Sequence, residues 1–386
     1  MKGLSGNLWP IHLKPYPNEL LSSWLVRLAH AHGLKLQSFC AIVFGPGKSI
    51  WNRDIDKLSP DWLLKHLAIA TGTSLKRVKE TTLKSYEGIL YERHQPNGNT
   101  RWIIPLGVYH RIHQHPGLQF CPVCLASDKE PYFRKYWRLA FYTECEKHHI
   151  LLHDRCPHCG EAVNFHRVEM GIRSLIKPRS IVNCYKCNYD LRDASKNVIH
   201  CSDWQAVIQQ RTLLAFHELG WGFTENLTIQ YSHQLFDVLR HLCTLMLSKN
   251  RAGGLLPYIS KKICLDNIVI NISTHVFEKL TVRERHYLFL CANWFILKWP
   301  SRFIEVSNNM NLTNAYLLEY YKEPPYWFRS IIETYLSKRR YSPTLDEIQS
   351  VEKYLIANGL RTGISNISRL LGCTTLKRSK QLLIDN

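Results

Sequence analysis

The sequence predicts a mostly α-helical, multi-domain fold in which helix-turn-helix units lie on either side of a cysteine-rich middle. Apolar residues recur at helical spacing near both ends, four closely spaced pairs of Cys or His stand between residues 121 and 187, and 386 residues suffice for several cores. We expect a helical domain with a helix-turn-helix over residues 1–115, a cysteine-rich part over 116–202, a helical domain over 203–340, and a C-terminal helix-turn-helix-like unit over 341–386.

The first predicted helices lie between residues 18 and 45. An apolar i, i+3, i+4, i+7 series runs from Leu21 to Leu28, with Asn18 before it as a predicted cap and Gly33 after it. A second apolar series follows that glycine. The two series predict a pair of short amphipathic helices.

Residues 59–83 have the outline of a helix-turn-helix. Ser59-Pro60 predicts one helix start, Gly72 a helix end, and Ser74 the cap of the next helix. The second helix carries a basic face that is a candidate for DNA contact, although an ordinary helical hairpin with a solvated basic face fits the same pattern. The candidate residues are Lys76, Arg77 and Lys79.

Residues 91–120 are expected to form a polar connection, and helices resume beyond the cysteine-rich part. An apolar stripe over 235–246 predicts one helix, and a capping box of Thr281 and Glu284 predicts another over 281–299. The pair Pro324-Pro325 and the basic run at 338–340 are predicted to be linker-like breaks.

The last 45 residues form a second helix-turn-helix outline. A capping box of Thr344 and Glu347 begins one helix, whose apolar positions include Ile348 and Ile356, and a short helix over 367–371 precedes a last helix from Thr375. That last helix presents polar and basic side chains to a groove of DNA. These candidates are Lys377, Arg378, Lys380 and Gln381.

The cysteine-rich middle has the spacing of two zinc modules. Each module combines two pairs, and within a pair two intervening residues separate the ligands, so that both reach one ion from a tight turn. Four Cys or His ligands close the coordination shell, which is typical of structural zinc, and we expect two structural Zn²⁺ in tandem zinc-ribbon-like, or zinc-finger, modules. The predicted ligands are Cys121, Cys124, Cys145 and His148 for the first module, and Cys156, Cys159, Cys184 and Cys187 for the second.

One ligand has an alternative, because His149 directly follows His148 and a spacing of three residues also occurs in zinc sites. Six other cysteines have no paired spacing, and we interpret them as small core residues. They are Cys40, Cys201, Cys243, Cys264, Cys291 and Cys373.

The net charge of +19 points to a polyanionic partner such as nucleic acid, because contacts with phosphates release counterions. No secretory signal opens the sequence, and its longest apolar run, at 287–297, is too short to span a bilayer. We therefore expect a cytoplasmic protein without membrane contact, whose thirteen cysteines do not form a disulfide framework.

Two sets of residues partly resemble enzyme sites. The sequence Gly45-Pro-Gly47-Lys48-Ser49 imitates the end of a phosphate-binding loop, but Ile42 stands where the first glycine is required. A metal-dependent nuclease would use His148 or His149 with Asn164 and His166. Asn164 and His166 are too close in sequence to lie on the separate hairpin and helix of that motif. No catalytic residue is therefore predicted.

The motifs along residues 11–190 occur in a specific order. Residues 15–25, Pro-Tyr-Pro-Asn-Glu-Leu-Leu-Ser-Ser-Trp-Leu, precede the two cysteine modules and the tripeptide at 137–139. In this order the motifs resemble the TniQ family, and the helical remainder resembles it only loosely. The motifs are Cys121-Pro-x-Cys124, Trp137-Arg138-Leu139, Cys145-x-x-His148, Leu152 and Cys156-Pro-His-Cys159-Gly160.

The resemblance implies a non-enzymatic accessory factor of bacterial transposons of the TniQ/TnsD type. Such factors select the target, by reading DNA directly or by riding on an RNA-guided CRISPR effector of the Cascade type, and recruit an AAA+ ATPase of the TnsC or TniB type that activates the transposase. It implies His148 rather than His149 as the ligand, and it leaves Cys184 and Cys187 to their own spacing. Homodimerisation stays open.

The sequence therefore predicts a target-selection adaptor for DNA transposition. Two alternatives remain: a stand-alone, zinc-containing, sequence-specific DNA-binding regulator, and a zinc-containing nuclease. The regulator would footprint DNA without an ATPase, and the nuclease would cut DNA with a divalent metal. The amino-terminal segment 1–60 is the predicted contact for the ATPase, because zinc binding does not explain its motif. A fold-stabilising role for Trp24 and Leu25 explains the motif equally well.

Overall fold

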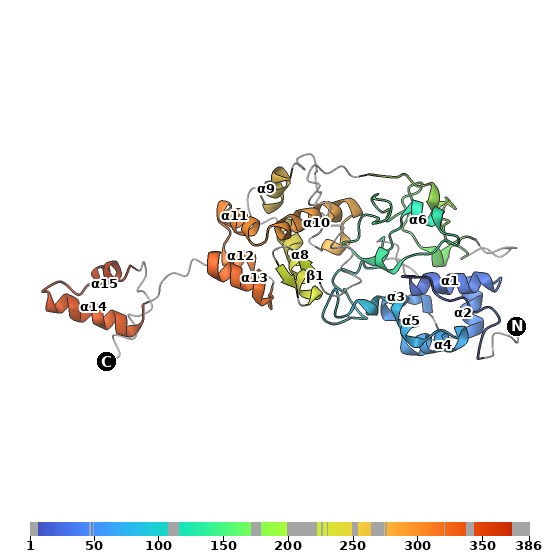
Figure 1. Cartoon of the computed structure of the whole chain (residues 1–386), viewed down its shortest axis with the longest axis horizontal. Helices are drawn as coiled ribbons and strands as arrows, with labels where there is room; N and C mark the ends of the chain where they lie inside the picture. The colour runs from blue at the N-terminus through green and yellow to red at the C-terminus, as the bar shows by residue number, and fades with distance from the viewer. Residues whose placement is uncertain are drawn as a thin grey trace.

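A computed structural model describes residues 7–45, 48, 50–106, 116–170, 179–198, 222–224, 227–229, 231–248, 254–263, 274, 276–319, 321–336 and 343–372. The described chain is mostly helical (Figure 1), as predicted. Its α-helices are α1 Leu21–Ala31, α2 Leu36–Phe44, α3 Ile55–Leu58, α4 Asp61–Thr71, α5 Leu75–Glu80, α6 Pro122–Ser127, α8 Ser232–Leu247, α9 Leu255–Lys262, α10 Val282–Leu297, α11 Ser301–Asn309, α12 Asn314–Leu317, α13 Tyr326–Ile331, α14 Leu345–Ala357 and α15 Ile364–Leu370.

Shorter elements complete the described fold. Two three-residue strands, β1 Gly222–Thr224 and β2 Leu227–Ile229, pair antiparallel with Gly222 opposite Ile229. Short 3₁₀ turns and one π-helical turn link the helices: η2 Ile50–Asn52, η3 Leu83–Tyr86, η4 Lys135–Arg138, η5 Phe165–Arg167, η6 Leu191–Asp193, η7 Phe277–Lys279 and η8 Ile332–Leu336. Across the described ranges, no helix has the length and apolarity needed to cross a bilayer.

The start of α1 corrects the prediction that Asn18 caps this helix. Asn18 lies in a turn with φ +54°, and α1 begins at Leu21. The carboxylate of Asp56 accepts a hydrogen bond from the Ser22 N–H at 2.7 Å, and the Thr81 carbonyl accepts one from the Leu21 N–H at 3.0 Å. Two of the unpaired N–H groups of the first turn are thus satisfied by segments distant in sequence.

The predicted helix-turn-helix near residues 59–83 has its helices in place. Pro60 is the N-cap of α4, Gly72 ends α4 with φ +57°, and the Ser74 hydroxyl accepts a hydrogen bond from the Arg77 N–H at 3.3 Å. The helices α4 and α5 pack against each other. Val78 on α5 is buried, which fixes the basic positions of this helix on its outer side.

One cluster of buried apolar side chains extends from Trp9 to Leu336 among the described residues. Trp102 lies within it, with its ring edge-on to Phe141 at 5.3 Å and to Phe277 at 5.4 Å, and its Nε1 donates to the Phe236 carbonyl at 3.1 Å. The prediction of a polar connection over 91–120 is therefore wrong at this position. Trp102 joins α8 and η7 to the cysteine-rich part of the chain.

The later helices follow the predicted pattern with one correction. The helices α8 and α10 pack together, and Thr281 with Glu284 forms the predicted capping box. Pro324-Pro325 is not a linker break, because Pro325 is the N-cap of α13, whose Phe328 is fully buried. The basic run at 338–340 lies outside the described residues.

The helices α14 and α15 have a small core of their own, formed by Ile348, Leu355 and Ile367. The capping box of Thr344 and Glu347 is present as predicted. Of the apolar positions predicted for α14, Ile356 is 68% exposed and lies outside this core. The helix α15 begins at residue 364, three residues before the predicted start. The predicted last helix and its candidates Lys377, Arg378, Lys380 and Gln381 lie outside the described residues.

Candidate metal centres

Three of the four ligand pairs sit on turns of the same construction. The N–H of the first ligand donates to the carbonyl five residues later, and the N–H four residues later donates back to the first ligand's carbonyl, at 2.7–2.9 Å. One residue on either side of each turn forms an isolated antiparallel bridge, which closes a short hairpin. The hydrogen-bonded groups are Cys145 with Ile150 and His149, Cys156 with Glu161 and Gly160, and Cys184 with Tyr189 and Asn188.

The residue directly after the second ligand is left-handed in all three turns. His149 has φ +55°, Gly160 +72° and Asn188 +63°. Glycine and asparagine tolerate this conformation best, and it turns the chain back so that both ligands of a pair face the same point. The turn geometry thus explains why two intervening residues separate the ligands.

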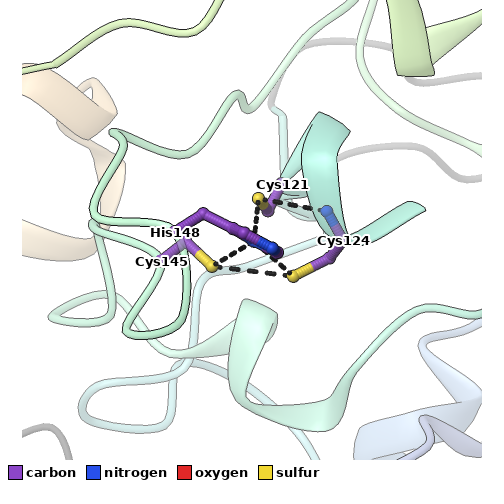
Figure 2. A group of neighbouring side chains, drawn as sticks. All are labelled: Cys121, Cys124, Cys145 and His148. Atoms are coloured by element: carbon purple, nitrogen blue, oxygen red, sulfur yellow. Dashed lines mark hydrogen bonds between the residues drawn. The ribbon is translucent and has the colours of Figure 1, made fainter. Parts of the chain in front are cut away.

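The fourth pair uses a helix start instead. Cys121 is the N-cap of α6, and its sulfur accepts a hydrogen bond from the Cys124 N–H at 3.4 Å. Pro122 occupies the first turn, where its missing N–H costs nothing. The helix places Cys124 beside Cys121, with both sulfurs on the side that faces the next turn (Figure 2).

The first ligand group converges on one point, as Figure 2 shows. The Nδ1 atom of His148 lies 3.4 Å from the Cys121 sulfur, 3.2 Å from that of Cys124 and 3.4 Å from that of Cys145. A tetrahedral zinc with sulfurs about 2.3 Å and a nitrogen about 2.0–2.1 Å away sets these edges at about 3.5 Å. The donor set and its dimensions therefore fit one zinc ion.

The alternative ligand His149 faces elsewhere. As the left-handed residue of its turn, it directs its side chain away from the sulfurs; its Nδ1 lies 3.8 Å from Glu144, and its side chain is 51% exposed. The group of potential ligand atoms within 4.8 Å of one another contains His148 and not His149. The geometry favours His148, as the resemblance implies.

The second ligand group consists of four sulfurs. The Cys156 and Cys187 sulfurs are 3.6 Å apart, and those of Cys159 and Cys184 are 3.7 Å apart. The edge of a zinc–sulfur tetrahedron is about 3.8 Å, whereas a disulfide would bring two sulfurs to about 2.05 Å. These distances fit a Cys₄ zinc site. Each of the two groups can thus hold one zinc ion.

Other cysteines behave as predicted where they are described. Cys40, Cys243 and Cys291 are buried and form no disulfide. Cys201, Cys264 and Cys373 lie outside the described residues.

A buried polar network joins the segment between the ligand pairs of the first metal site to the amino-terminal helices. The Arg138 guanidinium donates to the Asp54 carboxylate at 2.5 Å and lies 3.5 Å from that of Asp56. Asp56 also accepts hydrogen bonds from the N–H and hydroxyl of Ser22. Sequence reasoning missed this network, although Ser22 and Arg138 both belong to the quoted motifs.

A second buried pair reinforces the same junction. Glu19 accepts hydrogen bonds from Arg27 at 2.6 Å and from the Ser23 hydroxyl at 3.2 Å, and Ser23 in turn accepts one from the Phe133 N–H at 3.0 Å. Glu19, Ser23 and Trp24 are fully buried. The motif at 15–25 therefore holds the fold together at this junction, and its buried side chains offer no surface to a partner.

The candidate residues of a nuclease site do not come together in the fold. His148 faces the three sulfurs, whereas Asn164 and His166 line a cavity of about 20 Å³ together with Asp56. Burial, together with the nearby charge of Arg167, lowers the pKa of His166 to about 3, so this ring is a poor base at neutral pH. The cavity has room for about one water molecule, and neither amide atom of Asn164 has a protein partner.

The amino-terminal candidates for DNA contact are surface residues of α5. Lys76 and Lys79 are exposed, and the Arg77 guanidinium donates to the Pro15 carbonyl at 2.8 Å. Arg77 thus has a structural contact in addition to any role toward DNA. Whether these residues bind nucleic acid stays a prediction.

Comparison with protein families supports the resemblance. The family model described as TniQ matches residues 10–152, so the chain carries a TniQ domain, as the motifs predicted. The match includes the first ligand group and ends before the second. No curated protein matches the chain.

Proposed function

We propose that this chain, whose residues 10–152 are a TniQ domain, selects targets for DNA transposition and recruits an AAA+ ATPase that activates the transposase. The TniQ domain gives the chain a transposition-associated adaptor role, in a family of non-enzymatic adaptors that work with the transposition machinery. We further propose that the chain selects the target and that its partner is an ATPase of the TnsC or TniB type. The match to the TniQ family model supports both proposals.

The metal sites support this function as scaffolds. We assign the eight converging residues as ligands of two Zn²⁺ ions, each with a full shell of four protein ligands and hence no open position for water or substrate. Bound zinc would supply folding free energy to residues 121–190. Its role would be to hold surfaces in place and not to cleave bonds.

The charge supports a nucleic acid partner. The excess of 50 Lys+Arg over 31 Asp+Glu suits a DNA duplex or a guide RNA in a CRISPR effector complex. Among the described residues, the exposed Lys76 and Lys79 on α5 are candidates for DNA contact. We also propose as DNA contacts the four carboxyl-terminal candidates Lys377, Arg378, Lys380 and Gln381. We retain the four-part division at residues 115, 202 and 340 as part of this proposal.

The decisive experiment combines purified chain, target DNA and the ATPase encoded next to the transposase. We expect the chain to capture the ATPase on DNA and to show neither DNA cleavage nor ATP hydrolysis of its own. Footprinting of DNA without ATPase capture would favour the stand-alone regulator. Metal-dependent cleavage would favour the nuclease.

The same experiment separates two routes to the target. A chain that retains the ATPase on one DNA sequence without RNA reads DNA directly. A chain that requires a guide-RNA complex for that retention relies on base pairing for specificity. Our proposal includes both routes, and the result decides between them.

A further inference from the structure

The helix α4 has a second apolar face that the core does not use. Leu63 and Leu67 point into the core and are at most 2% exposed, whereas Trp62 and Ile69 are 41% and 61% exposed. Trp62, His66 and Ile69 are spaced by four and three residues, which places them on one side of the helix. The helix lies at the outer edge of the amino-terminal helices (Figure 1).

This outer face is held in a fixed arrangement. The Trp62 ring is edge-on to Phe44 at 5.8 Å, and the Lys48 ammonium lies 4.3 Å above the centre of the Trp62 ring. The His66 ring lies between those of Trp9 and Phe44, at 5.9 and 5.3 Å. Side chains fixed before binding lose little conformational entropy when a partner covers them.

The apolar face continues beyond the end of α4. Leu8 is 52% exposed, and its Cδ1 lies 3.4 Å from the position that a side chain on Gly72 would take. The Trp9 N–H donates to the Ala70 carbonyl at 2.8 Å, which holds this segment against the helix. We call the surface formed by Leu8, Trp62, His66 and Ile69 the α4 face.

The charges around the α4 face are mostly positive. Lys48 and Lys65 are exposed beside it, and Lys14 lies at its end, where its ammonium donates to the Gly72 carbonyl at 2.6 Å. Asp61, at the start of α4, is the one exposed acid on this helix. An amphipathic helix bordered by Asp and Glu complements an apolar stripe flanked by lysines.

Nucleic acid is a poorer match for this surface. Phosphates gain nothing from covering Trp62 and Ile69, whereas burial of apolar surface contributes about 25 cal/mol per Å². The lysines suited to DNA, Lys76 and Lys79, lie on α5, a separate helix of the same helix-turn-helix. One motif can therefore contact DNA with one helix and a protein with the other.

We propose that the α4 face docks an acidic amphipathic helix of the partner ATPase. The inference rests on the proposed function and changes the location of the contact. The motif is buried from Glu19 to Leu25. The proposed contact is therefore centred on Trp62 and Ile69, just beyond segment 1–60, and includes Leu8 of that segment. The lysines bring the partner helix into position, and the apolar side chains retain it.

The test measures ATPase capture by the full, zinc-loaded chain on DNA. The double variant Trp62→Ser/Ile69→Ser should weaken capture at least about tenfold, while DNA affinity and zinc content stay unchanged. The matched control, Tyr326→Ser/Tyr335→Ser, removes two aromatic rings that are 85% and 58% exposed on another part of the chain, and should change capture less than about twofold. Equal capture by the wild type and the α4-face variant would overturn the proposal.

Two further measurements keep the result interpretable. Lys65→Glu reverses one charge beside the α4 face and leaves the contact of Lys48 with Trp62 in place, and it should weaken capture most at low salt. If the change at Trp62 impairs folding, the single variant Ile69→Ser tests the α4 face instead, and it should also weaken capture. A wild type that captures no ATPase refutes the proposed function itself. Conversion of a dimer into a monomer with unchanged capture would assign the face to a second copy of the chain and overturn the inference.

Discussion

The two metal centres differ in how deeply the fold encloses them. In the first centre the three cysteines are buried and His148 is half-buried, whereas in the second Cys156 and Cys184 are buried and Cys159 and Cys187 are half-buried. The first centre joins a helix start to a hairpin turn, and the second joins two hairpin turns. The second centre is thus the more exposed of the two by one ligand.

The residues just before and between the ligand pairs of the first centre contact two other parts of the chain. Arg138 connects its surroundings to the amino-terminal helices through Asp54 and Asp56. On the other side, Arg285 of α10 donates to the Ala140 carbonyl at 2.6 Å and to Gln119 at 3.2 Å. The match to the TniQ family includes this centre and not the second. The comparison indicates that the first centre stabilises the whole fold and the second a local module.

The largest expected effect is that of removing a ligand from the first centre. Cys124→Ser should lose one zinc per chain and leave no soluble, folded protein. Binding of structural zinc contributes about 10–16 kcal/mol, which is comparable to the total stability of a domain. The yield of soluble protein measures the loss of folding. Elemental analysis and thermal unfolding of any soluble fraction measure its zinc content and its stability.

The control for this experiment is Cys243→Ser. Cys243 is equally buried but lies in α8, away from both centres. Its variant should keep two zinc ions per chain. A soluble Cys124→Ser protein with an unchanged melting temperature would contradict the central role of the first centre.

The next largest effect is expected at the connection between the first centre and the amino-terminal helices. Arg138→Met leaves two buried carboxylates without their cation, and we expect a loss of about 3–5 kcal/mol in the free energy of unfolding. Chemical denaturation measures the loss. Combining Arg138→Met with Asp54→Asn and Asp56→Asn should recover part of it, because the buried negative charges are then absent.

A smaller effect is expected at the second centre. Cys187→Ser should lose one zinc and unfold the two hairpin turns of this centre locally, while the free energy of global unfolding falls by only about 1–3 kcal/mol. Zinc content, together with hydrogen exchange, separates local from global unfolding. If this variant were as insoluble as Cys124→Ser, the two centres would be equivalent and the comparison would fail.

Much of this arrangement could be predicted from the sequence, because the signals are local. Spacing within each Cys/His pair reflects a single turn, and the capping boxes at Thr281 and Thr344 reflect one turn of helix. What could not be predicted depends on partners far away in sequence. Asp56, 34 residues away, satisfies the Ser22 N–H of α1 and so makes the Asn18 cap unnecessary.

The same limit applies to the candidate contact surfaces. The motif at 15–25 looks like a recognition surface in sequence, because nothing nearby explains Glu19 or Ser23. Only the folded chain shows Arg27 and the Phe133 N–H as their partners. The spacing along α4 does place its inward face at Leu63, Leu64 and Leu67, which are buried. It does not show whether another segment of the chain covers Trp62 and Ile69, which are exposed.

The smallest expected effect concerns pH and lies far from both centres. Burial lowers the pKa of His241 to about 4, against about 6.5 in the unfolded chain, while its hydrogen bond to the Leu317 carbonyl opposes the shift. Between pH 6.5 and 4 the unfolded state binds the extra proton. Stability should therefore fall on acidification, by up to about 1.4 kcal/mol per pH unit from this residue.

The variant His241→Gln tests that effect. It keeps an N–H donor for the Leu317 carbonyl but cannot titrate, so the slope of stability against pH should decrease by about one proton's contribution. Unfolding measured at several pH values between 7 and 5, with zinc content unchanged, isolates this slope from loss of metal. An unaltered slope would show that His241 does not contribute to it.

The separate core of α14 and α15 has a consequence for engineering. Ile348, Leu355 and Ile367 pack with one another, while the main apolar cluster ends at Leu336 among the described residues. A different carboxyl-terminal unit can therefore be grafted after residue 336 without opening the main core. The parts before that point share packing around Trp102, so they are not portable as separate pieces. Exchange of the carboxyl-terminal unit is therefore the engineering step that disturbs the main core least.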